Sequence, residues 1–178
     1  MKAHEFLELL EKENISIDEL SALLVKALSD KSLKIATAES CTGGLISKKI
    51  TDVSGSSSVF DCGVCTYANH IKHKLLSVKE ETLSTYGAVS EKTALEMARG
   101  VRLLSGADIG ISTTGIAGPM GGSQYKPVGL VYVGISTKDK LLSRKLLLSE
   151  GREPDRERIR DLASACALYF ALHEIDEI

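Results

Sequence analysis

Hydrophobic positions recur along the chain in two alternating patterns, one with the spacing of an amphipathic helix and one typical of buried strands. Near the N-terminus, apolar residues three and four positions apart predict a short leading helix within residues 5–15 and a main helix over about 17–29. Ser16, with Glu19 three residues later, predicts a capping box at the start of the main helix.

The rest of the chain alternates predicted strands with predicted helices. Strands are predicted at 33–38, 59–67, 109–113, 128–137 and 141–148. Helices are predicted at 45–50, 71–76, 80–85, 90–106 and from Pro154 onward. This order predicts an α/β fold with a mixed sheet covered on both faces. We expect a single domain over 16–178, with 1–15 as a helical extension.

The composition is typical of one globular domain, because 43% of the 178 residues are hydrophobic and 26% are charged. A net charge of −2 and an aromatic content of 4% argue against a nucleic-acid binder, which needs basic surface and stacking rings. The charged start is unlike a signal segment, and no apolar run approaches the ~20 residues of a membrane span. Four cysteines do not make a disulfide scaffold, so we expect a reduced, cytoplasmic protein without a membrane partner.

The segment Glu39-Ser40-Cys41-Thr42-Gly43-Gly44 lies between a predicted strand and a predicted helix. A helix start offers unpaired backbone N–H groups, and glycines let a ligand approach the backbone closely. A hydroxyl at this position can attack a carbonyl whose developing oxyanion meets those N–H groups. The alternative is that Ser40 or Thr42 is only a helix cap.

Two further segments extend this chemistry. Tyr67 ends a predicted strand and Lys72 lies one turn into the next helix, where a lysine with a lowered pKa can serve as the base for a serine. The alternative is a surface lysine on a polar helix face. The segment 113–122 is rich in glycine and follows a buried strand, which indicates a binding loop rather than a disordered one.

Arginines at 152, 156, 158 and 160 cluster around the start of the last predicted helix. These arginines suit bidentate binding of a phosphate, or form a solvated face with charge pairs four residues apart.

Two other patterns give little support for a metal site. Cys62 and Cys65 lie in a strand and point to opposite faces, and His70 and His73 lack a third ligand, so we expect no metal site.

At these segments the sequence resembles the CinA C-terminal domain family, which includes the nicotinamide-nucleotide amidases. The resemblance covers about residues 16–172. The matching words are Thr37-Ala38-Glu39-Ser40-Cys41-Thr42-Gly43-Gly44, Thr66-Tyr67-Ala68-Asn69-His70-Ile71-Lys72, Gly87-Ala88-Val89-Ser90, Gly115-Ile116-Ala117-Gly118-Pro119 and Lys126-Pro127-Val128-Gly129. The chain departs from the family pattern at Ala68, often Ser, and at Pro154, where the family has Gly. It is similar to the stand-alone amidase rather than to proteins with a large preceding domain.

The resemblance implies a three-layer α/β/α sandwich with a mixed, mostly parallel sheet, and hydrolysis of nicotinamide mononucleotide (NMN) to nicotinate mononucleotide and ammonia. It implies no metal or organic cofactor, and a homo-oligomer. The family's nucleophile falls on Ser40, its lysine on Lys72 and its tyrosine on Tyr67, with either Lys72 or Tyr67 as the proton acceptor. We expect the substrate to be held by Glu39, Cys41, Thr42, Gly43, Gly44, Asn69, Thr114, Gly115, Ile116, Ala117, Gly118 and Arg156, with Arg152 as the second choice of arginine.

Two other functions remain open from the sequence. One is an amidase acting on a different small amide. The other is a non-catalytic interaction module, since the family is named from competence and DNA-damage contexts.

Overall fold

The computed structural model describes residues 8, 12, 15–149 and 155–176. Arg152, Pro154 and most of the predicted leading helix lie outside the described residues. The strands are β1 (Ile35–Glu39), β2 (Phe60–Cys65), β3 (Ile109–Gly115), β4 (Leu130–Ser136) and β5 (Leu141–Leu147). The helices are α2 (Ile17–Asp30), α3 (Leu45–Thr51), the 3₁₀ turn η1 (Ser56–Ser58), α4 (Asn69–Leu76), α5 (Glu80–Thr85), α6 (Glu91–Ser105) and α7 (Arg156–Asp176).

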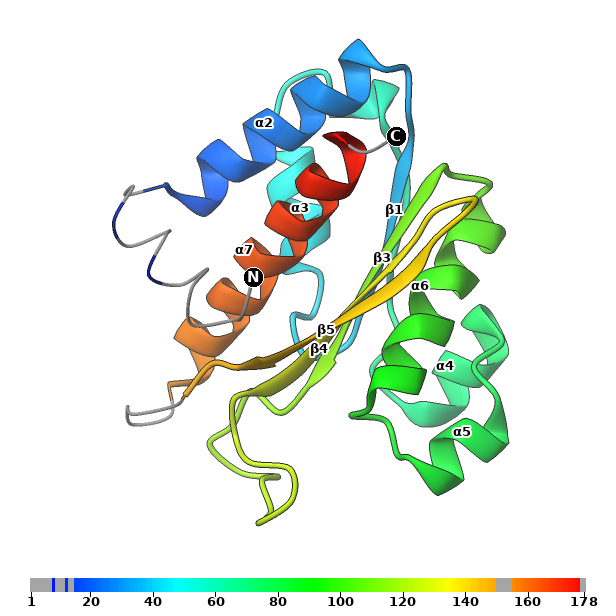
Figure 1. Ribbon diagram of the computed structural model, residues 1–178, viewed down its shortest axis with the longest axis vertical. Coiled ribbons are helices and arrows are strands. Elements are labelled where there is room, and N and C mark those ends of the chain that lie inside the picture. Colours follow the sequence, from blue (N-terminus) through cyan, green and yellow to red (C-terminus); the bar gives the residue numbers. More distant parts are fainter. Residues whose placement is uncertain (1–7, 9–11, 13–14, 150–154, 177–178) are drawn as a thin grey trace.

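The five strands form one sheet in the order β2-β1-β3-β4-β5. β1 pairs in parallel with β2 and β3, whereas β4 is antiparallel to both of its neighbours. Four strands therefore run in one direction and β4 alone opposes them, which confirms the mixed, mostly parallel sheet. The carboxyl ends of β1, β2 and β3 meet at one edge, toward the lower end of Figure 1.

Helices cover both faces of this sheet, as the three-layer prediction requires. α3 and α7 lie on one face with α2 packed against them, and α6 lies on the other with α4 and α5 beside it (Figure 1). The larger core fills the α2–α3–α7 side and the smaller lies under α6. All five residues of β1 are buried, because the strand is covered by both layers.

α6 approaches the sheet unusually closely at Gly134. A Cβ atom at this position would lie 2.3 Å from the Ala94 carbonyl oxygen, so any side chain would push the helix away. The Ser112 hydroxyl donates a 2.6 Å hydrogen bond to the same carbonyl. This contact fixes α6, and with it the segment that leads into its start.

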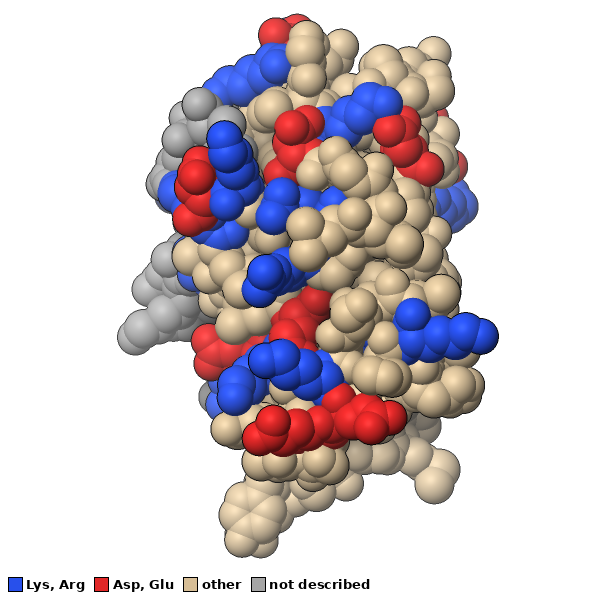
Figure 2. Space-filling view, turned by 90° about the vertical axis from the view of Figure 1, so that its right-hand side faces the viewer, with Lys and Arg blue, Asp and Glu red and all other residues tan. Residues whose placement is uncertain are grey.

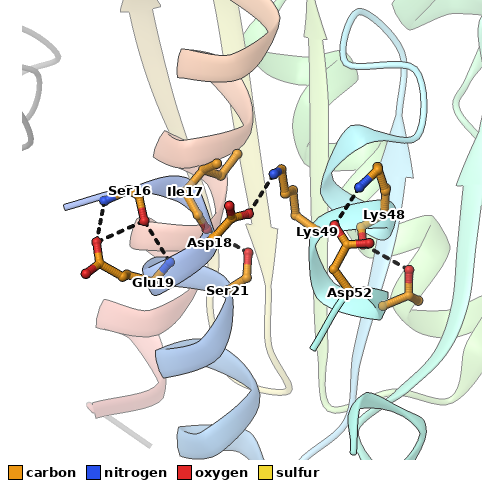
Figure 3. A network of polar contacts seen from close by, with 9 residues as sticks. Ser16, Ile17, Asp18, Glu19, Ser21, Lys48, Lys49 and Asp52 are labelled. Atoms are coloured by element: carbon orange, nitrogen blue, oxygen red, sulfur yellow. Dashed lines mark hydrogen bonds and ion pairs between the residues drawn. The ribbon is translucent and has the colours of Figure 1, made fainter. Parts of the chain in front are cut away.

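α2 begins at the predicted capping box. The Glu19 carboxylate accepts the Ser16 N–H at 2.7 Å, and the Ser16 hydroxyl accepts the Glu19 N–H at 3.1 Å (Figure 3). An ion pair of 2.6 Å between Asp18 and Lys49 links this first turn to α3. The sequence therefore placed this helix start correctly.

The surface over α4–α6 carries charges of both signs side by side (Figure 2). Within the described ranges, no helix combines the length and the apolar character needed to cross a bilayer.

Candidate active site

Ser40 lies directly after β1, at the sheet edge where the parallel strands end. Its N–H donates to the Thr113 carbonyl at 3.0 Å, which ties the start of the turn to β3. The Thr42 and Thr113 hydroxyls share a buried hydrogen bond of 2.7 Å, and Arg160 from α7 donates to the Thr42 carbonyl at 2.8 Å. Two neighbouring elements thus hold the turn in which Ser40 sits.

Lys72 reaches the same edge from α4. Its side chain is the largest fully buried one among the described residues, and its Nζ lies 3.0 Å from Ser40 Oγ. The amine also donates to the carbonyl oxygens of Thr66 at 2.6 Å and Tyr67 at 3.1 Å. β2 ends at Cys65, two residues before the predicted end, because Thr66 and Tyr67 leave the sheet to form this cradle.

Burial lowers the pKa of Lys72 to about 8, because desolvation disfavours the ammonium form. Burial also raises the pKa of the neighbouring Cys41 thiol to about 12, and the negative charge of Glu39 adds to that rise. Cys41 is therefore a neutral thiol near pH 7, whereas Lys72 has a substantial neutral fraction. The serine, not the cysteine, is the nucleophile that this environment favours.

A cavity of about 200 Å³ opens beside the Ser40–Lys72 pair. Eight of its lining residues were predicted from the sequence to act at the site: Ser40, Cys41, Tyr67, Lys72, Thr114, Gly115, Ala117 and Arg156. Ala88 and Val89 also line it and were missed. Their signal was the family word Gly87-Ala88-Val89-Ser90, to which no site role was assigned from the sequence. The Thr114 hydroxyl holds this segment by donating to the Ala88 carbonyl at 2.7 Å.

Tyr67 contributes to the site differently from the sequence-based expectation. Its backbone carbonyl, rather than its phenol, contacts Lys72. The ring is 66% exposed, and its hydroxyl accepts a 3.3 Å hydrogen bond from Arg156. The direct Lys72–Ser40 contact makes Lys72 the proton acceptor that the geometry favours over Tyr67.

Several expected substrate-binding residues are absent from the cavity wall: Glu39, Thr42, Gly43, Gly44, Asn69, Ile116 and Gly118. The Gly118 carbonyl instead accepts the Arg156 guanidinium at 2.6 Å, which holds that side chain at the cavity. The expectation that Glu39 contacts substrate does not fit its position, since its carboxylate is fully buried against α3.

The N-terminus of α3 was expected to offer unpaired backbone N–H groups to a ligand, and it does not. Glu39 accepts the N–H groups of Gly44, Ile46 and Ser47. These amides are therefore engaged before any ligand arrives, and the start of α3 does not offer them to an oxyanion.

Among the described residues, no group of three or more His, Cys, Asp or Glu side chains could hold a metal ion.

Comparison with known proteins shows which family this chain is similar to. A family model described as the CinA C-terminal domain matches residues 17–175. A relative from Caldanaerobacter subterraneus subsp. tengcongensis, named as competence-damage inducible, is 55% identical over 148 residues, covering 83% of this chain and 35% of that protein. The chain thus spans about a third of the length of the curated relatives it matches.

Solved structures share this fold over about nine-tenths of the chain. The competence/damage inducible protein CihA from Agrobacterium tumefaciens is 40% identical with a TM-score of 0.84, covering 90% of this chain and 95% of that one. A CinA superfamily protein from Klebsiella pneumoniae is 29% identical with a TM-score of 0.86, covering 92% and 100%.

Proposed function

This chain belongs to the CinA C-terminal domain family, and on that premise we propose that it is a nicotinamide-nucleotide amidase. The reaction is hydrolysis of the carboxamide of NMN to nicotinate mononucleotide and ammonia. The observation that carries this proposal is the 3.0 Å contact between Lys72 Nζ and Ser40 Oγ at the wall of a cavity. The family and its relatives' names leave the substrate open, so the activity rests on this site and on the motif resemblance.

The cradle around Lys72 orients the amine for its role as base. A neutral amine has two N–H bonds and one lone pair, and the carbonyls of Thr66 and Tyr67 can only accept hydrogen bonds. These carbonyls therefore take the two N–H bonds, and the lone pair faces the Ser40 hydroxyl. In the contact between Lys72 Nζ and Ser40 Oγ, the charged ammonium donates to the hydroxyl, whereas the neutral amine accepts the hydroxyl proton.

The reaction then follows from this arrangement. Lys72 takes the Ser40 proton as Oγ attacks the carboxamide carbon, and the lysine then gives a proton to the nitrogen as the C–N bond breaks. Ammonia leaves and an ester to Ser40 remains. Water attacks that ester, Lys72 accepts one of the water's protons and returns it to Ser40 Oγ as the bond to Ser40 breaks, and the carboxylic acid product loses its remaining proton to the solvent to become the carboxylate.

The oxyanion that forms during each attack needs donors that are not already engaged. The Ser40 N–H is bound to Thr113, and the first amides of α3 are bound to Glu39. The amides of Cys41 and Thr42 face the Cys41 thiol, which lines the cavity and is a weak acceptor. Of the two residues only Cys41 lines the cavity, so we assign its amide to the oxyanion, which accepts hydrogen bonds far better than the thiol.

The size and charge of the cavity fit a small anionic amide. A volume of about 200 Å³ is below the ~300–1,000 Å³ of pockets that enclose drug-sized ligands. It accommodates the pyridine carboxamide and leaves the ribose phosphate toward Arg156. The small side chains of Ala88, Val89 and Ala117 form the apolar part of the wall.

The experiment is ammonia release from NMN by the wild type, Ser40→Ala and Lys72→Met. Both variants are expected to lose at least about 10³-fold in kcat, because removal of one member of a nucleophile–base pair disables the other. Lys74→Met is the matched control, since Lys74 is exposed on the same helix. It should retain wild-type activity.

Three outcomes would contradict the proposal. Unchanged turnover in Ser40→Ala would exclude the nucleophile. Release of ammonia from another small amide in preference to NMN would retain the chemistry and exclude the substrate, and no release from a panel of pyridine and aliphatic amides would favour the non-catalytic alternative.

A further inference from the structure

Glu39 is a buried carboxylate that lies next to the nucleophile and does not face the cavity. It is fully buried and lies at the end of β1, directly before Ser40. Its Oε2 accepts the N–H of Gly44 at 2.9 Å and of Ile46 at 3.2 Å, and its Oε1 accepts the N–H of Ser47 at 2.8 Å. The Ser47 hydroxyl adds a fourth hydrogen bond of 2.7 Å.

These bonds replace a cap that α3 otherwise lacks. The residue at the N-cap position is Gly44, which has no side chain to accept the first helical amides. A charged acceptor makes shorter and stronger hydrogen bonds to N–H groups than a neutral one. The carboxylate of Glu39 thus stabilises the helix start from five residues upstream.

The turn between Ser40 and α3 needs such an anchor because it contains two glycines. Gly43 and Gly44 have φ values of 63° and 95°, in the left-handed region that glycine adopts without strain. Two adjacent glycines in a turn leave many other conformations open. The side chain of Glu39 closes a ring from the residue before the nucleophile to the helix after it, and so restricts the turn.

We infer that Glu39 is a positioning residue, which holds the Ser40 turn in the conformation that brings Oγ to Lys72 and the amide of Cys41 to the oxyanion. The inference rests on the proposed function for the identity of the reaction. It concerns the geometry of Ser40 itself, so it can be tested with a probe that needs no amide substrate.

The first test variant is Glu39→Gln, which keeps the size of the side chain. The amide offers one oxygen as acceptor and turns an NH₂ donor toward a position where Glu39 accepts an N–H, so one bond becomes a repulsion. The kcat for ammonia release from NMN is expected to fall about 10- to 100-fold with KM within about threefold, because the substrate does not touch Glu39. A loss of this kind moves kcat and leaves binding intact.

The second readout is the rate at which diisopropyl fluorophosphate phosphorylates Ser40. This probe reacts with an activated serine, whatever the natural substrate. The labelling rate should fall in Glu39→Gln by a factor similar to the fall in kcat. If the wild type is labelled but releases no ammonia from NMN, the proposed function fails while this comparison still decides the role of Glu39.

Glu96→Gln is the matched control. Glu96 on α6 also accepts a backbone N–H, from Lys79 at 2.8 Å, and a hydroxyl, from Thr82 at 2.8 Å, but these contacts join the start of α5 to α6 and do not reach Ser40. It is expected to lower the unfolding temperature with kcat and labelling unchanged. A purely structural role for Glu39 predicts the same behaviour in both variants.

Ser47→Ala covers the case in which Glu39→Gln does not fold. It removes one hydrogen bond to Glu39 and keeps the three amide contacts, and it should slow labelling of Ser40 a few-fold. The inference is overturned if a folded Glu39→Gln protein keeps its labelling rate and kcat within about twofold of the wild type. If Glu39→Gln does not fold, the same result in Ser47→Ala overturns it. A wild type that is not labelled at Ser40 also overturns it.

Discussion

In the proposed mechanism Lys72 carries the proton chemistry, so the pKa of Lys72 sets the pH dependence expected of the reaction. The amine is charged below its pKa and neutral above it, and the neutral form alone can accept the Ser40 proton. Since burial lowers the pKa of Lys72 from 10.5 to about 8, the neutral fraction near pH 7 is roughly a tenth. An exposed lysine with an ordinary pKa would be neutral in less than about one molecule in a thousand at that pH.

The rate is therefore expected to rise with pH and to level off above about pH 8. A profile of kcat/KM between pH 6.5 and 9.5 reports the pKa of the free enzyme's base, and it should rise by up to tenfold per pH unit on the acidic side. The range starts at 6.5 because a phosphate monoester loses its second proton near pH 6. A flat profile, or one that still rises steeply at pH 9.5, would exclude a desolvated Lys72 as the base.

The sequence predicted the identity of these residues better than their orientation. Ser40 and Lys72 were found from their motifs, and the structure brings them into contact. Glu39 belongs to the same motif, but whether its side chain faces the substrate or α3 depends on tertiary packing. Tyr67 was expected to act through its phenol and contacts Lys72 through its backbone, which no pattern of side chains reveals.

At the scale of elements, α2 allows a test of whether a helix can lose stability without a change in activity at the candidate site. Its first turn is held by the Ser16–Glu19 capping box, which is exposed and lies outside the cavity wall. Ser16→Ala is expected to lower the free energy of unfolding by about 1 kcal/mol, because the amide of Glu19 loses its acceptor.

Urea denaturation checks this value, and ammonia release checks that kcat is unchanged. Ser29→Ala is the control, since Ser29 is exposed near the other end of α2 and alanine favours a helix. It should leave stability equal or slightly higher. A loss in Ser29→Ala equal to that in Ser16→Ala would show that the cap contributes nothing.

The elements were largely predictable from local patterns and the three layers from the family resemblance, whereas the order of the strands was not. Caps and periodicity located α2 and α6 to within about a residue, since both signals are local. The strand order places β1 between β2 and β3, and that order depends on long-range pairing. The close approach of α6 at Gly134 is equally non-local, because a glycine in a strand pattern does not show which helix lies against it.

At the scale of the whole molecule, the site is assembled from distant parts of the chain. Arg156 comes from the start of α7, yet it reaches Gly118 in the loop after β3 and the hydroxyl of Tyr67 before α4. Both partners are neutral, so neither cancels the charge of the guanidinium. A chain with a net charge of −2 thus places a cation at the wall of the candidate site.

This placement predicts that Arg156 binds the phosphate of NMN rather than its pyridine. Arg156→Gln is expected to raise KM for NMN about 10- to 100-fold, since a hydrogen bond to a charged group contributes ~1.5–3 kcal/mol. KM for the riboside, which lacks the phosphate, should stay within about threefold. Arg99→Gln, which removes an exposed arginine outside this cavity, is the control and should change neither value.

Salt provides an independent check of the same contact. Added salt screens the attraction between Arg156 and a phosphate, so KM of the wild type for NMN should rise between 50 and 300 mM NaCl, and KM of Arg156→Gln should rise less. An equal rise of KM for the nucleotide and the riboside in Arg156→Gln would instead mean that the arginine shapes the cavity through Gly118 and Tyr67. The phosphate would then have to be bound by another cation at this end of the sheet, such as Arg160, which donates to the Thr42 carbonyl.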